Sequence, residues 1–372
     1  RSPGCIQRLA NATIRRQAGP SNTGGLVPGP AASGGPRHAL LVVLLPRTGV
    51  GREPGLVSAG GTLGASGALG LKTLGWAGPV MGTRARIMVV SRDAGAGEVA
   101  LDRAVRDLEK TESVLSRFRE DSELGTLNRE GTVLAGGRLM AAVRASVTAY
   151  RWSGGLLDAR VIDALEGFGY RYSLPRGYIA GTAKPRPLAP AEPDRWIDEA
   201  SGRVILPDGI RLDLAGVGKA LGIGWAARCL AGHAGLLVDV GGDVLALGTD
   251  EDGRPWRVAV DHDGGVVGEF SGSALAVATS TTARRRWATP EGEAHHLIDP
   301  RTGAPATSEL THASVAAPTI LEADLAAKLL MVGGRSGTRY LDHRCRVVVT
   351  NREGTTEVLN VETGPAEKSV GA

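Results

Sequence analysis

Apolar residues recur with the period of an α-helix in four stretches of the chain. In the first stretch, leucine, valine and phenylalanine fall on one face with charged residues between them, as on a helix that packs against a core. The second stretch ends at Gly154-Gly155, a pair that commonly stops a helix. The pattern predicts helices over four ranges: 98–118, 139–152, 215–232 and 321–331. The polar run 116–128 is predicted to be a helix end followed by a loop.

Short runs of valine, isoleucine and leucine, bounded by glycine or charged residues, predict strands between these helices. The runs are 85–90, 204–206, 210–214, 236–240, 256–260, 275–279, 314–317 and 346–349. Strands and helices alternate unevenly along the chain. This order favours an α+β fold or a mixed α/β fold over a regular doubly wound sheet.

The periodic patterns occupy only part of the chain. Residues 1–76 are dominated by glycine, proline, serine and arginine, with little periodicity, and are predicted to be a low-complexity, disordered extension. Residues 77–350 are predicted to form the folded domain, and 351–372 a polar C-terminal tail.

Composition and charge narrow the classes of function. Hydrophobic residues make up 42% and charged residues 22% of the chain, as expected for a packed domain. The net charge is only +4, and no stripe of basic residues alternates with aromatic ones, so nucleic acid is not an expected partner. The three cysteines, Cys5, Cys229 and Cys345, have neither metal-site spacing nor an even number for disulfides.

The chain shows no apolar run of the roughly 20 residues that cross a membrane as a helix. The best candidate, 39–45, ends at Pro46, and it makes a poor signal peptide after so long a polar start. No lipobox precedes Cys5. These observations predict a cytoplasmic or membrane-peripheral protein and leave the compartment and the oligomeric state open.

Gly216-Val217-Gly218-Lys219 opens a predicted helix after a predicted strand. Asp239 follows about twenty residues later, as in a dinucleotide-binding fold, but the third glycine is misplaced by one position. An NAD-linked oxidoreductase is therefore a weak hypothesis, and glycines required for close packing explain the pattern equally well. A helix N-terminus with a lysine in its first turn is nevertheless a good anion site.

Two further stretches contain candidate chemistry. Small and hydroxyl residues at 276–282 precede Arg284-Arg285-Arg286, a pattern that suits phosphate oxygens, although a solvated arginine cluster is the simpler interpretation. His295-His296 precede the turn Asp299-Pro300. Histidine exchanges a proton near neutral pH, and a rigid turn would hold it in place for use as a base.

Taken together and in order, eight short motifs resemble the ApbE-type FAD:protein FMN transferase family. The motifs are Met81-Gly82-Thr83; Asp121-Ser122-Glu123-Leu124 within 116–128; Asp158 with Gly167-Phe168-Gly169-Tyr170; Leu212 to Lys219; Val240-Gly241-Gly242-Asp243; Ala278-Thr279-Ser280; His296 to Gly303; and Ala323-Asp324. Each is short, but their common order across 81–334 is specific.

The resemblance implies an α+β fold with mixed sheets and FAD bound between its halves. It implies transfer of FMN from FAD to a threonine or serine hydroxyl of an acceptor flavoprotein, with release of AMP and with Mg²⁺ as the metal. The implied base is His296, and the implied metal ligands are the Gly216 carbonyl and Asp324. The implied flavin-site residues are Met81, Ser122, Glu123, Leu124, Asp158, Lys219, Thr279 and Ser280.

The chain departs from the family pattern at two positions. Lys328 stands where a threonine usually completes the metal site, and a protonated ammonium has no lone pair to offer a metal. We therefore expect a lower metal affinity than usual, or partial replacement of the ion by Lys328. Asp158 is followed by Ala159-Arg160 in place of the usual Pro-Thr, which changes the expected detail of the flavin pocket.

Two alternatives remain within the resemblance. A FAD pyrophosphatase would use the same residues with water in place of the acceptor hydroxyl. A flavin-binding protein without chemistry is expected if Lys328 abolishes metal binding. The acceptor protein is not identified by the sequence.

Overall fold

The computed structural model describes residues 65–66, 69–173, 181, 184–262, 265–290, 292–359 and 361. Most of the stretch predicted to be disordered lies outside these residues. Strand β2 (Lys72–Val80), however, begins before the boundary predicted at residue 77. Strand β18 (Thr356–Leu359) pairs with β17 (Arg346–Asn351) and lies in the predicted tail. Both predicted boundaries therefore fall inside the main sheet.

A nine-stranded sheet forms the centre of the domain, in the order β1-β2-β3-β7-β8-β11-β16-β17-β18. Its remaining strands are β1 (Ala65–Ser66), β3 (Thr83–Ser91), β7 (Gly235–Val240), β8 (Asp243–Gly248), β11 (Ala274–Thr281) and β16 (Leu310–Ala316). Every pairing between these described strands is antiparallel. The α+β class is confirmed, whereas the mixed sheets implied by the resemblance are corrected to antiparallel ones.

Smaller sheets surround this centre. They are the hairpin β9 (Trp256–His262) with β10 (Gly265–Gly272), the set β4 (Thr132–Leu134), β6 (Arg203–Ile205) and β5 (Ile197–Asp198), and the pairs β12 (Arg286–Thr289) with β13 (Gly292–His295) and β14 (Ile298–Asp299) with β15 (Ala304–Pro305). Of these strands only β6 and β9 were predicted. Glycine, arginine and proline interrupt the apolar pattern of β10 and of β12 to β15, and β4 and β5 are too short to show one.

All four predicted helices are present. They are α2 (Ala94–Leu115), α4 (Gly137–Trp152), α6 (Ala215–Cys229) and α7 (Ile320–Gly333). Two short helices, α3 (Glu123–Glu130) and α5 (Ile162–Gly167), and the 3₁₀ turns η1 (Ala159–Val161), η2 (Pro193–Trp196) and η3 (Gly334–Tyr340) complete the set. None of the helices in the described ranges is long and apolar enough to cross a membrane.

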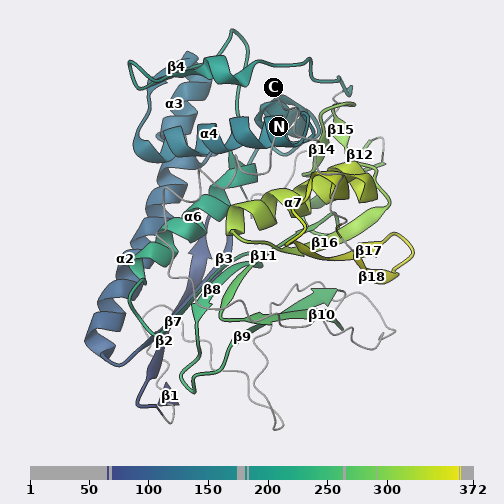
Figure 1. The fold of residues 1–372 in the computed structure, drawn as a ribbon. Helices are drawn as coiled ribbons and strands as arrows, with labels where there is room; N and C mark the ends of the chain where they lie inside the picture. The colour runs from purple at the N-terminus through teal and green to yellow at the C-terminus, as the bar shows by residue number, and fades with distance from the viewer. Residues whose placement is uncertain are drawn as a thin grey trace, which may run out of the picture.

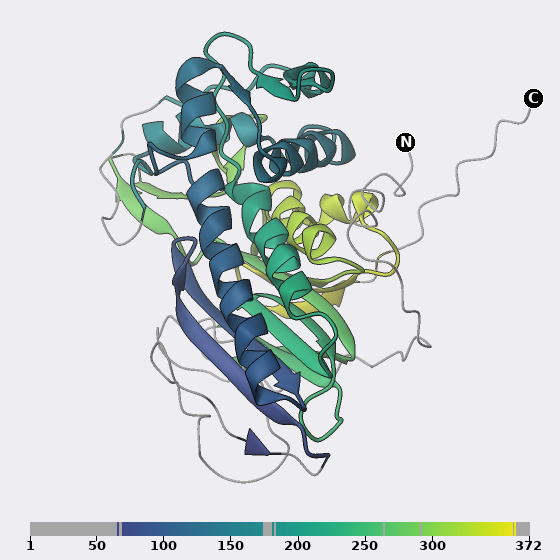
Figure 2. The ribbon, with the colours of Figure 1, turned by 90° about the vertical axis from the view of Figure 1, so that its left-hand side faces the viewer.

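The helices and the β9–β10 hairpin cover opposite faces of the main sheet. Figure 2 shows α2 and α6 running side by side along one face, and Figure 1 shows α7 over β11 and β16. Strand β7 illustrates the consequence: Leu236 and Val238 pack in the helix-side core, while Leu237 packs in the core beneath the hairpin. A strand buried on both faces loses the polar alternation of a surface strand.

The predicted strand 210–214 is wrong. These residues form no strand, because the backbone of Leu212 is satisfied by a side chain: Leu212 N donates to Asn128 Oδ1 (2.8 Å) and Asn128 Nδ2 donates to the Leu212 carbonyl (2.9 Å). Helix α6 therefore follows an extended loop and not a strand, and β7 pairs antiparallel with β3 and β8. The parallel strand-helix-strand unit that an NAD-binding interpretation requires is absent from this part of the chain.

The turn between β7 and β8 brings acidic residues to the end of the sheet. Gly241 and Gly242 have φ of 68° and 97°, as a two-residue hairpin turn requires. A Cβ on Gly241 would lie 2.8 Å from Thr83 Oγ1, so no larger residue fits there without movement. The tight turn places Asp243 beside Lys219 of α6, while Asp239 pairs with Arg86 of β3.

Candidate functional site

A cavity of about 350 Å³ lies where the beginning of α6 and the middle of α7 meet the ends of β7 and β11. The segment 296–298 closes a third side and 156–161 a fourth. Helix α6 points its N-terminus at this space, as the sequence predicted for an anion site. The partial positive charge of a helix N-terminus attracts anions there.

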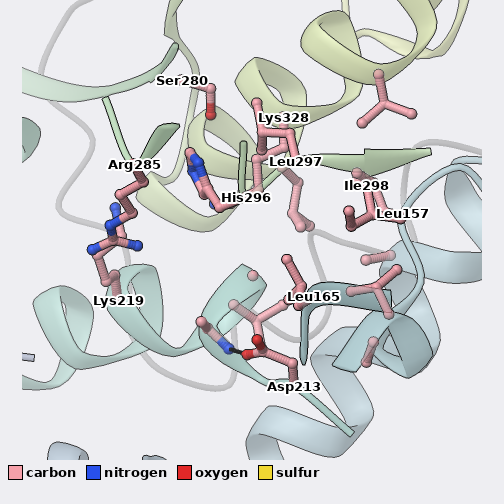
Figure 3. Close-up of a pocket in the computed structure, with 18 of the residues that line it drawn as sticks. Leu157, Leu165, Asp213, Lys219, Ser280, Arg285, His296, Leu297, Ile298 and Lys328 are labelled. Atoms are coloured by element: carbon pink, nitrogen blue, oxygen red, sulfur yellow. Dashed lines mark hydrogen bonds between the residues drawn. The ribbon is translucent and has the colours of Figure 1, made fainter. Parts of the chain in front are cut away.

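The cavity has a cationic side and an apolar side (Figure 3). The cationic side holds Lys219, Arg285, His296 and Lys328. The apolar side holds Leu157, Leu165 and Ile298. A ligand with phosphate groups at one point and an aromatic ring system at another matches this division, because ammonium and guanidinium groups bind phosphate oxygens and apolar walls bind rings.

Lys219 is held by a buried carboxylate. Its Nζ pairs with Oδ2 of Asp243, which has no exposed side-chain surface, and Asp243 Oδ1 accepts from the backbone N–H of Thr279 at 3.2 Å. The Asp243 carboxylate helps to raise the pKa of Lys219 against the opposing effect of burial, so this lysine stays charged. Asp243 thus ties the cationic lysine to strand β11.

Asp324 and Lys328 form a second buried pair. They lie one turn apart on α7, where i and i+4 side chains face each other, and Lys328 Nζ contacts Asp324 Oδ1. Asp324 is 1% exposed, and its Oδ2 is buried without a hydrogen-bond partner. Burial raises the pKa of Asp324, and Asp243 raises it further, while Lys328 and Lys219 lower it. The two pairs are therefore close enough to share one electrostatic environment.

His296 lines the cavity as a neutral imidazole. Burial, together with the nearby charges of Arg285, Lys219 and Lys328, holds its pKa well below the ordinary 6.5. Its Nδ1 atom is buried and makes no hydrogen bond. A neutral ring with an unused nitrogen can accept a proton, which is the property that a general base requires.

The residues around His296 have structural roles. The ring of His295 is engaged by the Ala306 carbonyl (3.0 Å) and by the Leu297 N–H (3.3 Å), so this histidine braces the segment and does not line the cavity. Asp299 closes the turn by accepting from the backbone N–H and the guanidinium of Arg301. These contacts order the turn, and its role in fixing His296 stays a prediction.

A second, smaller cavity of about 80 Å³ adjoins the first and shares Lys219, Asp213 and Arg285 with it. Met81 lines this smaller cavity with a left-handed backbone, φ 54°, held by its N–H to Glu112 Oε2 at 2.8 Å. A methionine outside its preferred backbone region costs free energy, and such strain concentrates at ligand sites.

An arginine beside a pair of adjoining aromatic rings forms part of the wall of the smaller cavity. Arg117 is 3% exposed, lies 4.1 Å from the Phe118 ring centroid and 4.9 Å from that of Tyr170, and pairs with Asp213 at 3.0 Å. The two ring centroids are 5.5 Å apart, and Tyr170 lines both cavities.

Ser122, Glu123 and Leu124, which the resemblance placed at the flavin, line neither cavity. Ser122 caps α3 and donates to the carbonyls of Ser116 (2.8 Å) and Arg119 (2.9 Å). Glu123 accepts from Gly136 N (2.8 Å), and Leu124 is wholly buried in the core. Of the three, Ser122 supports the 116–119 loop that carries Arg117 and Phe118, and a direct contact with the flavin stays a prediction.

Asp158 does line the larger cavity, but its carboxylate is bound by Arg160 through Nε and Nη2, at 3.0 Å and 2.6 Å. Arg160 also donates to the Ala189 carbonyl at 2.7 Å. The departure Ala159-Arg160 thus places an arginine on the carboxylate that the resemblance assigned to the flavin.

The other residues that were predicted for the site lie together around the larger cavity. Gly216 in the first turn of α6 and Thr279 and Ser280 at the end of β11 line the larger cavity. Thr279 Oγ1 is hydrogen-bonded to Ser314 Oγ at 2.7 Å, which leaves Ser280 as the neighbouring hydroxyl toward the cavity (Figure 3).

The resemblance implies a Mg²⁺ ion with the Gly216 carbonyl and Asp324 as ligands. Mg²⁺ prefers near-octahedral oxygen coordination. Here Asp324 has one oxygen without a partner, but an ammonium contacts the other, and no group of three or more His, Cys, Asp or Glu among the described residues is placed to hold a metal. The residues present do not fit a resident Mg²⁺ on Asp324.

Sequence reasoning missed part of the site. Arg286 is exposed, as a solvated cluster predicts, but Arg284 and Arg285 line the cavity. Asp243 and Tyr170 were recognised only as parts of motifs and received no role. The signal for Asp243 was available, since an acid directly after a Gly-Gly turn must lie at the end of the sheet.

Comparisons with known proteins agree with this arrangement. The model of the ApbE family matches residues 81–349, which is more than half of the chain. A FAD:protein FMN transferase of Klebsiella pneumoniae is 28% identical over 312 residues, covering 78% of this chain and 85% of that protein.

Two crystal structures have the same fold. The ApbE protein of Thermotoga maritima superposes with a TM-score of 0.66 at 19% identity, covering 77% of this chain and 97% of its own. The apo form of the Pseudomonas stutzeri flavinyl transferase ApbE superposes with a TM-score of 0.65 at 22% identity, covering 78% and 96%. With the family match over residues 81–349, the chain belongs to the ApbE family.

Proposed function

We propose that this protein is a FAD:protein FMN transferase, which moves FMN from FAD to a threonine or serine hydroxyl of an acceptor flavoprotein and releases AMP. Membership of the ApbE family and the names of its relatives support a transferase. The observation that carries the proposal is a single cavity with a neutral histidine and cationic side chains on one side and apolar walls on the other.

In the proposed reaction, the acceptor hydroxyl oxygen attacks the phosphorus on the FMN side of the pyrophosphate. A new O–P bond forms, the bond from that phosphorus to the bridging oxygen breaks, and the bridging oxygen leaves with AMP. The hydroxyl proton passes to His296. A hydroxyl is a weak nucleophile at neutral pH, and a positioned base contributes about 10²- to 10⁴-fold to such a step.

The other cavity residues have roles that follow from their charge. Lys219, Arg285 and Lys328 would bind the pyrophosphate oxygens, where negative charge is concentrated throughout the transfer. We propose that the flavin ring lies against Leu157, Leu165 and Ile298, with FAD held between the α6–α7 side and the 156–170 segment. Asp158, Thr279 and Ser280 would line this ligand.

The Mg²⁺ implied by the resemblance receives no step in this proposal. Its predicted ligands were the Gly216 carbonyl and Asp324, and Asp324 is paired with Lys328. When bound to a pyrophosphate, Mg²⁺ neutralises charge on the phosphoryl oxygens. The described residues place ammonium and guanidinium groups where that charge would be needed.

Intact-mass spectrometry tests the transfer directly. The full chain is incubated with FAD and a threonine-containing acceptor flavoprotein domain, with AMP measured in parallel. We expect a mass gain equal to one FMN on the acceptor and an equal amount of AMP. AMP without a mass gain on any of several acceptors would replace the proposal by a FAD pyrophosphatase, and bound FAD with neither product would indicate a flavin-binding protein without chemistry.

The variant His296→Ala separates chemistry from binding. We expect FAD affinity within a few-fold of the parent and transfer reduced about 10²- to 10⁴-fold, because only the base is lost. His343→Ala is the matched control, since His343 is 63% exposed and lies outside both cavities. Loss of FAD binding in His296→Ala would mean that the ring supports the cavity and is not the base.

A further inference from the structure

We propose that Lys328 is a built-in substitute for a divalent cation, so that this protein binds FAD and transfers FMN without Mg²⁺. Asp324 then serves as the anchor of an ammonium and not as a metal ligand. The inference rests on the proposed function for its ligand, the FAD pyrophosphate, and specifies how that site neutralises charge.

Lys328 both contacts Asp324 and lines the cavity. Its Nζ contacts Asp324 Oδ1, and the side chain also lines the cavity next to His296 (Figure 3). The lysine side chain is 16% exposed and Asp324 only 2%, so the pair is largely removed from water. A buried ammonium held in this way keeps a fixed place, as a bound cation would.

Lys328 is one of two ammonium groups that carboxylates hold at the cavity. Lys219 is held by Asp243 in the same way, and the electrostatic influence of Asp243 and Lys219 reaches Asp324. Two carboxylates thus hold two ammonium groups at one end of the cavity, and Arg285 lines the same end. This provides several positive charges for a pyrophosphate.

The contact between Lys328 and Asp324 also disfavours a divalent ion on that carboxylate. Mg²⁺ on Asp324 would have to share that carboxylate with an ammonium already in contact with it, and like charges at such a distance repel. No third acidic or histidine ligand stands beside Asp324 among the described residues.

The test measures metal binding and FAD binding before activity. FAD affinity of the full chain is measured by flavin fluorescence in EDTA and in MgCl₂, and Mg²⁺ binding is measured by calorimetry with and without FAD. We expect equal FAD affinity in both conditions and no heat of Mg²⁺ binding. AMP release and mass gain on the acceptor are then followed in the same two buffers.

Lys328→Thr is the decisive variant. It should bind FAD about tenfold to a hundredfold more weakly in EDTA, the loss expected for a charged hydrogen bond, and recover in MgCl₂. Its thermal unfolding temperature should rise with Mg²⁺, because the metal then occupies the unpaired Asp324. Lys110→Thr, on the exposed face of α2, is the control and should respond to neither buffer.

The outcomes separate this inference from the proposed function. A parent chain that binds Mg²⁺ and needs it for FAD would overturn the inference, and so would Lys328→Thr that stays independent of metal with unchanged FAD affinity. Should no AMP or FMN transfer appear under any condition, the proposed function fails while the binding data still decide the role of Lys328. If Lys328→Thr does not fold, Lys328→Gln, whose amide can hydrogen-bond Asp324, takes its place with the same expectations for FAD in EDTA.

Discussion

Replacement of Lys219 by methionine tests whether the buried charge pairs are as dry as the structure indicates. Asp243 has no exposed side-chain surface and Lys219 is 18% exposed, so Lys219→Met leaves a carboxylate in the core with no counter-charge. Removing one partner of a buried pair typically costs about 3–5 kcal/mol. That loss is a large share of the roughly 5–15 kcal/mol that stabilise an ordinary domain.

The assay is equilibrium unfolding in urea, followed by circular dichroism, for the parent and three variants. Arg195→Met is the surface control: Arg195 and its partner Glu192 are 82% and 70% exposed, and such pairs contribute at most about 1 kcal/mol. The double variant Lys219→Met with Asp243→Asn should recover at least half of the loss, because no charge remains and the asparagine oxygen still accepts from Thr279 N. A loss below about 1 kcal/mol for Lys219→Met would refute the reasoning, since water would then be reaching Asp243.

Two further predictions concern acid and a helix cap. Burial holds the pKa of His296 well below 6.5 and that of His312 at about 3. Below about pH 6.5 these histidines are therefore protonated in the unfolded chain but not in the folded chain. The free energy of unfolding then falls by about 1.4 kcal/mol per pH unit for each histidine as the pH decreases. Urea unfolding at several pH values should show a slope smaller by about one proton in His312→Gln, and an unchanged slope would contradict the assignment. Ser122→Ala should lose about 1–2 kcal/mol of unfolding free energy through the lost cap, whereas Ser113→Ala, at a half-buried position of α2, should change it by less than about 0.5 kcal/mol. Equal losses for the two variants would mean that the cap does not stabilise the fold.

Helix α2 was predictable because it buries one face, and its 3.6-residue pattern does not depend on the arrangement of the neighbouring elements. Helix α7 is buried on nearly all sides, and it was predictable because a long apolar run without glycine or proline favours a helix. Segment 210–214 shows where this logic fails. Leu212 and Leu214 alternate with polar residues as in a strand, but Asn128 supplies the hydrogen bonds that a neighbouring strand would have supplied. A side chain 84 residues away in the sequence is invisible to a local pattern.

The site was predictable in part for a similar reason. The pairing of Asp324 with Lys328 follows from their i, i+4 spacing on a predicted helix, and the structure adds that the pair is buried. The burial of Arg284 and Arg285 could not be predicted, because it depends on how β11 ends against α6 and on the path of the chain to β12. The order of the motifs pointed to residues that line the cavity. The hydrogen bonds that Ser122 and Glu123 make are visible only in the structure.

The residues with a strained backbone line the same cavities as the cationic side chains. Within the described ranges, the non-glycine residues with left-handed backbone are Met81 and Arg285, with φ of 54° and 43°. Both line the smaller cavity together with Lys219, and Arg285 also lines the larger one. Such conformations cost on the order of 1–3 kcal/mol each and persist only where the surroundings impose them, as Glu112 does for Met81. We expect that replacing either residue with glycine stabilises the chain or leaves it unchanged and weakens FAD binding, because the imposed conformation would no longer hold the cavity lining in place.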